Sequence, residues 1–196
     1  MPRTARSLVP HGYYHLINRG NNRASVFLEP ADYRRFIGLM ERSQERVQLR
    51  LLAYCLMPNH FHLVASQDGQ RDISRWMHWL LTTHTYGHHV RHGTSGRVWQ
   101  GRFKTFLIEK DDHLLTVMRY VERNALRSGL VDRAEQWPWG SLALRVGQSG
   151  SSLLVDPPIR LPSDWSARVN APQTPQELEA LRRSVNHQRP YGVSMD

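Results

Sequence analysis

Two histidines separated by a single residue, His60 and His62, are the pattern in the sequence that points most directly to chemistry. They follow an apolar run at 49–56 and a turn at 57–59, a succession that predicts a β-hairpin with both histidines on its second strand. Side chains alternate between the faces of a strand, so both imidazoles would share one face while Phe61 points the other way, into a core. We interpret the pair as half of a metal site; the alternative is two half-exposed strand histidines that bind nothing.

A second half-site is predicted at Tyr120 and Asn124. Both lie in the segment 111–127, which is predicted to be a helix because it begins with aspartates, has apolar residues at positions 114, 118, 121 and 125, and is followed by Gly129 as a stop. Residues four apart share one helix face, and these two flank the apolar stripe, where a side chain is both rigid and reachable. Two imidazoles and a side-chain amide oxygen leave positions on a divalent ion open for phosphate oxygens. A tyrosine hydroxyl is a poor nucleophile until its proton is removed or a nearby cation stabilises the oxyanion, so the set predicts attack on a phosphodiester and a covalent phosphotyrosine.

The charge balance is consistent with a nucleic-acid partner, with 26 Lys and Arg against 17 Asp and Glu and a formal net charge of +9. A polar loop at 18–23 ends the predicted first strand, and a predicted strand at 97–109 alternates polar and apolar residues. The candidate DNA-binding residues are Asn18, Arg19, Asn21, Asn22 and Arg23 in the loop, and Arg97, Arg102 and Lys104 in the strand. A plain turn and an edge strand kept soluble by charge remain alternatives for these segments, and Trp99 and Phe103 are predicted to be core residues.

A long helix predicted at 73–91 also carries histidines four apart, His84 and His88. No acidic residue lies within this segment to complete a metal site, so we interpret the helix as a packing element.

The order of predicted elements is strand 12–18, helix 31–47, hairpin 49–66, helix 72–91, strand 97–109 and helix 111–127. This order predicts an α+β fold, an antiparallel sheet with helices packed on one face. We predict one catalytic domain over residues 1–148 and a C-terminal tail over 149–196. The tail is expected to carry a short helix at 174–185, to lie on or near the DNA groove, and to regulate or cover it.

The chain resembles the single-tyrosine HUH transposases, in particular the REP-associated tyrosine transposases of bacteria. The resemblance rests on five ordered blocks, at 14–23, 57–64, 96–104, 119–124 and 139–141. It implies a ferredoxin-like or RRM-like core, with His60 and His62 as metal ligands and Tyr120 as the nucleophile. Asn124 stands where shorter relatives place a glutamine that completes the metal site. The family usually has proline next, whereas this chain has Ala125, so we expect the helix to continue past Asn124.

The reaction implied by the resemblance is a transesterification on single-stranded DNA beside a repeat hairpin. The tyrosine takes the 5′ end, a 3′-hydroxyl leaves, Mg²⁺ or Mn²⁺ assists, and no nucleotide cofactor is needed. A monomer and a homodimer are both compatible with the sequence. Since Cys55 is the single cysteine and no apolar stretch is long enough to span a bilayer, we expect a cytoplasmic protein without a membrane partner. Two rivals remain open: a domesticated, non-catalytic binder of nucleic-acid hairpins, and a metal-dependent nuclease in which water attacks.

Overall fold

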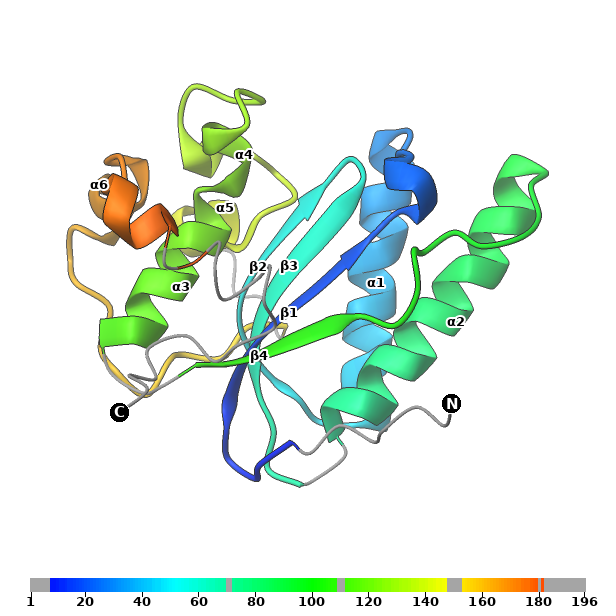
Figure 1. The fold of residues 1–196 in the computed structure, drawn as a ribbon, viewed down its shortest axis with the longest axis horizontal. Coiled ribbons are helices and arrows are strands. Elements are labelled where there is room, and N and C mark those ends of the chain that lie inside the picture. The colour runs from blue at the N-terminus through cyan, green and yellow to red at the C-terminus, as the bar shows by residue number, and fades with distance from the viewer. Residues whose placement is uncertain (1–7, 70–71, 109–111, 148–152, 180, 182–196) are drawn as a thin grey trace.

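The centre of the molecule is a four-stranded antiparallel sheet with the order β2-β3-β1-β4. A computed structural model describes residues 8–69, 72–108, 112–147, 153–179 and 181 (Figure 1). The strands are β1 (Tyr13–Arg19), β2 (Arg50–Met57), β3 (His60–Ser66) and β4 (Lys104–Ile108). With α1 (Pro30–Arg46) after β1 and α2 (Asp72–His92) after β3, the elements follow the βαββαβ order of a ferredoxin-like core. The predicted α+β fold is confirmed.

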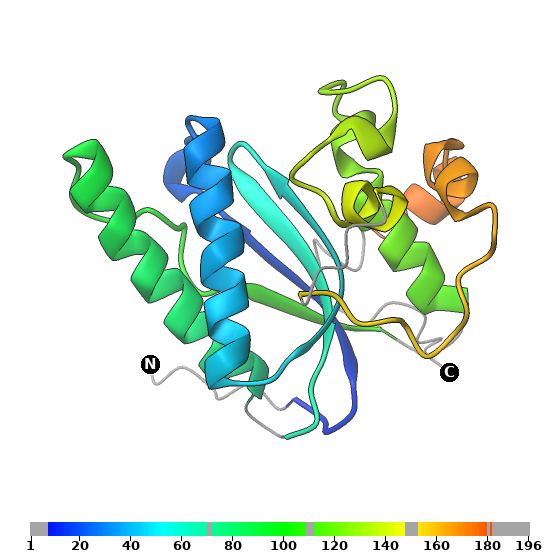
Figure 2. The ribbon, with the colours of Figure 1, turned by 180° about the vertical axis from the view of Figure 1, so that it is seen from behind.

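Helices cover both faces of this sheet, whereas the sequence led us to expect one covered face (Figures 1 and 2). Helices α1 and α2 pack on one face. The other is covered by the elements that follow the sheet: α3 (Asp112–Glu122), α4 (Asn124–Arg127), α5 (Ser141–Val146) and α6 (Trp165–Asn170). The physical reason lies in β2, where every residue from Leu51 to Met57 is buried. A strand that is apolar on both sides needs a packed layer on each.

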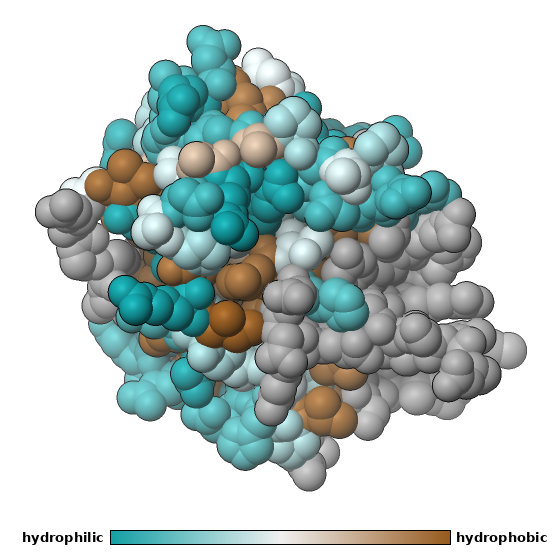
Figure 3. Space-filling model, turned by 90° about the vertical axis from the view of Figure 1, so that its left-hand side faces the viewer, coloured by the Kyte–Doolittle hydropathy of each residue, from teal (hydrophilic) through white to brown (hydrophobic). Residues whose placement is uncertain are grey.

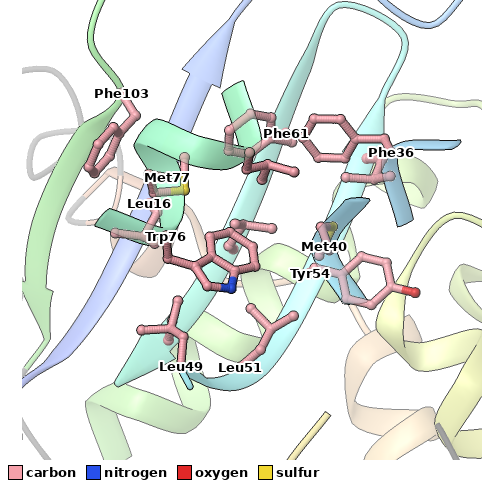
Figure 4. Packing of buried hydrophobic residues seen from close by; sticks show 14 of the residues in the cluster. Leu16, Phe36, Met40, Leu49, Leu51, Tyr54, Phe61, Trp76, Met77 and Phe103 are labelled. Atoms are coloured by element: carbon pink, nitrogen blue, oxygen red, sulfur yellow. The ribbon is translucent and has the colours of Figure 1, made fainter. Parts of the chain in front are cut away.

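The first core lies between the sheet and the pair α1 and α2. Phe61 meets Phe36 of α1 there with 5.5 Å between ring centres, and Trp76 and Met77 of α2 complete the packing (Figure 4). Phe61 is fully buried, as alternation along the histidine strand predicts.

The predicted strand at 97–109 is wrong in its first half, because β4 begins only at Lys104. Val98 and Trp99 are neighbours in sequence and both are buried in the first core, which a regular strand with alternating faces does not allow. The segment 97–103 is therefore irregular, and an isolated bridge between Gly20 and Trp99 and a hydrogen bond from Asn18 to Gly101 attach it to the end of β1. Trp99 and Phe103 are core residues, as predicted.

The predicted helix at 111–127 is interrupted at Arg123, which separates α3 from α4. Helical hydrogen bonding resumes past Asn124, as expected from Ala125 standing where the family usually has proline. The helical stretch is followed by Gly129, which has a φ of 68°. Part of the predicted terminal helix at 174–185 is present in the described residues up to 181, and the rest lies outside them. Within the described ranges, no helix is both long and apolar enough to cross a membrane.

Candidate active site

Two imidazoles from the sheet and one tyrosine from the helix above it meet on the face covered by α3. His60 and His62 lie on β3 with 5.0 Å between ring centres. The Tyr120 ring from α3 stands edge-on to His62 with centres 5.8 Å apart. The strand and the helix therefore bring together three side chains that the sequence places in two separate half-sites.

A third imidazole, His15 of β1, was not identified as a site residue from the sequence. Ile17 pairs with His62 in the ladder between β1 and β3, and His15 lies on the same face of β1 as Ile17. His15 Nε2 and His62 Nδ1 are 2.9 Å apart, and the rings stack with centres 5.1 Å apart. His15 is also edge-on to Tyr120 at 6.1 Å. The strand register, which the sequence pattern does not give, produces this contact.

All three imidazoles are held in the neutral form. Burial lowers the pKa of His15 to about 3. Burial, with the positive charges of Arg19 and Arg127, lowers the pKa of His60 to about 4. Burial and the neighbouring imidazoles hold the pKa of His62 well below its usual value. Neutral imidazole is the form that binds a metal.

The turn that precedes the histidines is fixed by backbone hydrogen bonds. The Gly20 amide donates to the Asn59 carbonyl at 2.7 Å, and the Val26 amide donates to the Pro58 carbonyl at 2.8 Å. A Cβ at Gly20 would lie 2.2 Å from the Ala24 carbonyl oxygen, so the close approach of the backbone at Gly20 to the backbone at Ala24 requires glycine. The contacts hold the start of β3, and with it His60, in place.

A buried carboxylate anchors the helix of Tyr120. Glu122 is 2% exposed and accepts hydrogen bonds from Ser141 Oγ at 2.6 Å, Arg145 Nε at 2.9 Å and Trp165 Nε1 at 2.7 Å. These partners come from α5 and α6, so the residues after the sheet fix the orientation of α3. Figure 3 views the molecule from this end, where hydrophobic residues lie among hydrophilic ones in the coloured part of the surface.

Asn124 lies one turn after Tyr120 and is fully buried. Its Oδ1 accepts a hydrogen bond from Arg127 Nη2 at 2.9 Å, and its Nδ2 is buried without a partner among the described residues. The Arg127 guanidinium lies over the Tyr120 ring, 5.5 Å from its centre. Arg127 is the second site residue that sequence reasoning missed, although the positions 120, 124 and 127 follow the spacing of a single helix face.

The donor set fits a divalent ion that keeps open coordination positions. His60 Nδ1 is 2.7 Å from Asn59 Oδ1, and His62 Nδ1 is bonded to His15, so outer partners orient both rings and leave Nε2 of each for a ligand. The Asn124 oxygen has a second lone pair beside its bond to Arg127. Among the described residues, no group of three or more His, Cys, Asp or Glu side chains is arranged to hold a metal. A bound ion would thus need amide and substrate oxygens in addition to the histidines.

Basic residues continue from the histidines across the sheet. Cross-strand pairing places His62 beside Ile17 and Ile17 beside Lys104, and it places His60 beside Arg19. A hollow of about 290 Å³ opens at this edge, lined by Ile17, Asn18, Arg19, Gln100, Gly101, Arg102 and Lys104. A second hollow, of about 520 Å³, lies between α2 and the segment 97–103 and is lined by Arg97 and Arg102 among others. The structure therefore gathers Arg19, Arg102 and Lys104 around one hollow, and Arg19 is the one of the three that pairs directly with a histidine, His60.

The remaining predicted DNA-binding residues are Asn18, which lines the first hollow from a buried position, and the turn at 21–23. Asn18 is 5% exposed and donates from Nδ2 to the Gly101 carbonyl at 3.2 Å, so its amide holds the segment 97–103 in place. Asn21, Asn22 and Arg23 form a 3₁₀ turn after β1, in which the exposed Asn22 and Arg23 have φ of 51° and 60°. This turn lines neither hollow.

Comparison with known proteins shows one family model and several solved structures to which this chain is similar. The family model described as "Transposase IS200 like" matches residues 8–124. The structure of the REP-associated tyrosine transposase bound to a REP hairpin is similar with a TM-score of 0.63 and 19% identity, over 83% of this chain and 96% of that one. A protein described as a transposase from Deinococcus radiodurans R1 has a TM-score of 0.43 and 18% identity, over 62% of this chain and 96% of that one. Comparison with curated protein sequences gave no match.

Proposed function

The chain belongs to the IS200-like transposase family, and from this membership we propose that it is a single-stranded DNA endonuclease and strand transferase that acts beside repeat hairpins. Tyr120 is the proposed nucleophile. Its oxygen forms a bond to the scissile phosphorus, the bond to the 3′ oxygen breaks, and the 5′ end stays on the protein as a phosphotyrosine. The observation that supports this most strongly is the convergence of Tyr120, from α3, with His60 and His62, from the sheet beneath it.

The proposed chemistry is reversible strand transfer. The energy of the phosphodiester is retained in the phosphotyrosine bond, so a 3′-hydroxyl can attack it and rejoin the strands without a nucleotide cofactor. In this proposal Arg127, which lies over the ring of Tyr120, would stabilise negative charge on the attacking oxygen and on the phosphate.

The metal in this proposal is Mg²⁺ or Mn²⁺, held by His60, His62 and Asn124. When bound, the ion would polarise the scissile phosphate and stabilise its developing charge. His15 and Asn59 orient the two imidazoles through their Nδ1 atoms.

The proposed substrate is a single strand that carries a repeat hairpin, the kind of DNA to which the solved relative is bound. From the histidines the strand would cross the sheet over Ile17 to Lys104, a distance of about 10 Å at two strand spacings. Arg19, Arg102 and Lys104 would contact its phosphates, with Asn18 supporting the hollow from within. Arg97 and the turn at 21–23 would contact DNA further along.

The test is covalent capture. Wild-type protein and Tyr120→Phe are incubated with labelled single-stranded hairpin DNA from repeats near the gene, with Mg²⁺ or Mn²⁺, and resolved on denaturing gels. We expect a protein–DNA band that is lost in Tyr120→Phe, while hairpin binding is retained. Free cleavage products in both proteins would replace the proposal with hydrolysis by water. Binding without cleavage under either metal would leave a non-catalytic hairpin-binding protein.

A further inference from the structure

The guanidinium of Arg127 lies among the residues proposed to hold the metal. Its Nη2 donates to Asn124 Oδ1 at 2.9 Å, and its central carbon is 5.5 Å from the centre of the Tyr120 ring. Beside burial, the charge of Arg127 contributes to the low pKa of His60 and of His62, so the guanidinium is close to both imidazoles as well. A positive charge of the protein itself therefore lies within the proposed metal site.

The contact with Arg127 fixes which atom of the Asn124 side chain is engaged. A guanidinium can only donate hydrogen bonds, so the amide atom that faces it is the oxygen and not the nitrogen. Asn124 is fully buried, and its Nδ2 has no partner among the described residues. The oxygen proposed as the third metal ligand is thus the one polar atom of this side chain that Arg127 holds.

Arg127 and a divalent ion would compete for this oxygen. A carboxamide oxygen has two lone pairs, so its geometry permits both partners, but their charges repel each other. Even at the dielectric constant of water, a divalent ion and a guanidinium about 5 Å apart weaken each other's binding about tenfold. The buried carboxylate of α3, Glu122, does not offset this repulsion, because it is already hydrogen-bonded to Ser141, Arg145 and Trp165.

A phosphate of the substrate can release the oxygen. Arg127 is exposed and is the last residue of the short helix α4, so its side chain can turn without disturbing packed residues. A guanidinium binds a phosphate through two parallel hydrogen bonds, a stronger arrangement than one bond to an amide oxygen. The scissile phosphate has to lie within reach of the Tyr120 oxygen, and Arg127 lies over the ring of that residue.

From these contacts we propose that Arg127 is a switch that makes metal binding depend on DNA. Without DNA, its guanidinium engages the Asn124 oxygen and weakens binding of the ion. With DNA, it moves to the scissile phosphate and leaves that oxygen to the ion. The switch rests on the proposed function, since it takes His60, His62 and Asn124 as the ligands, and it adds an order of binding in which DNA precedes the metal.

The test measures Mn²⁺ affinity by electron paramagnetic resonance in full-length protein that carries Tyr120→Phe and cannot form the covalent complex. Arg127→Leu is added to this background. Without DNA, we expect Arg127→Leu to tighten Mn²⁺ binding about tenfold or more, because the competing cation is gone. With hairpin DNA, the two proteins should differ less than about threefold, so the gain in affinity on adding DNA should fall severalfold in Arg127→Leu.

The matched control is Arg19→Leu in the same background. Arg19 is exposed, and beside burial its charge also contributes to the low pKa of His60 and of His62. Its removal leaves the bond between Arg127 and Asn124 intact, so DNA-free Mn²⁺ binding should tighten less than about threefold. Arg127→Gln, which removes the charge but keeps a polar side chain, should behave as Arg127→Leu does, and urea unfolding checks that each variant is folded.

Unchanged or weaker DNA-free Mn²⁺ binding in Arg127→Leu would overturn the switch. Equal tightening in Arg19→Leu would also overturn it, because the effect would then come from net charge alone. Covalent capture separates these results from the proposed strand transfer. A covalent complex formed by the wild type, together with unchanged Mn²⁺ affinity in Arg127→Leu, would overturn the switch alone. Tighter DNA-free binding in Arg127→Leu, without any covalent complex in the wild type, would support the switch while strand transfer failed.

Discussion

His15→Leu is the substitution that tests most directly how the candidate site is organised. It removes the hydrogen bond of 2.9 Å to His62 Nδ1 while keeping an apolar side chain of moderate size in a position that is 2% exposed. His62 is 5% exposed, so water has little access to replace the lost partner. The His62 ring would then lose the contact that fixes its tautomer and orientation.

Loss of such an outer partner typically costs about 10–100-fold in metal affinity, equivalent to about 1.4–2.7 kcal/mol. Because the contact between His15 and His62 is buried, we expect the upper half of that range. The metal concentration that gives half-maximal covalent complex should rise by that factor. Near-saturating metal should restore much of the yield.

The assay is the yield of covalent protein–DNA complex on hairpin DNA across a titration of Mg²⁺ or Mn²⁺. His15→Gln is the matched control, because a glutamine amide nitrogen can take the place of His15 Nε2 and hydrogen-bond His62. It should require less metal than His15→Leu. A positioning role for His15 would be refuted if His15→Leu needed the same half-maximal metal concentration as the wild type. In that case a lower yield of covalent complex would be explained by lower protein stability, which urea unfolding measures.

Three further predictions follow from the charges and contacts of the described residues. Burial lowers the pKa of His84 to about 3. Below about pH 6.5 the unfolded chain therefore takes up a proton at His84 that the folded chain excludes. His84 should account for about 2 kcal/mol of the free energy of unfolding that is lost between about pH 7 and about pH 5. When the free energy of unfolding is measured in urea, His84→Gln should lose less of it between these pH values, by about that amount. Equal pH dependence of the unfolding free energy in the two proteins would contradict this. Arg127→Gln removes the cation over Tyr120 and should slow covalent-complex formation about tenfold or more while leaving hairpin binding close to wild type, and an unchanged rate would exclude its proposed role. Truncation of residues 174–196 removes the carboxylate of Glu177, which lies 3.9 Å from Arg119 Nη1. Loss of this negative charge should tighten hairpin binding severalfold in a gel-shift titration. Unchanged affinity and cleavage would count against a regulatory tail.

The parts of the site that the sequence predicted depend on local periodicity. The alternation of His60, Phe61 and His62 follows from the geometry of a strand, and the common face of Tyr120 and Asn124 follows from the geometry of a helix. The first relation holds within β3 and the second spans only the short break at Arg123 between α3 and α4, so neither depends on the pairing of distant elements. The fold class was predictable for the same reason, since it depends on the order of such elements.

The parts that the sequence could not predict depend on pairing between distant elements. His15 joins the site only because the register of β1 against β3 places Ile17 opposite His62. The irregular path of 97–103 follows from burial of the adjacent Val98 and Trp99, which depends on α1 and α2 being in place. The second helical layer had a visible signal, the unbroken apolar run from 51 to 57, which indicates a strand covered on both faces.

The electrostatics of the site predict that metal and DNA bind cooperatively. The proposed ligands His60, His62 and Asn124 are all neutral, and the nearby Arg19 and Arg127 are positive, so the protein alone offers little attraction to a divalent cation. A phosphate of the bound strand would supply the missing negative charge, and by linkage the metal would increase DNA affinity by the same factor. We expect Mn²⁺, measured by electron paramagnetic resonance, to bind Tyr120→Phe at least about tenfold more tightly with hairpin DNA than without it. Equal Mn²⁺ affinities would mean that the ion is held by ligands other than these three.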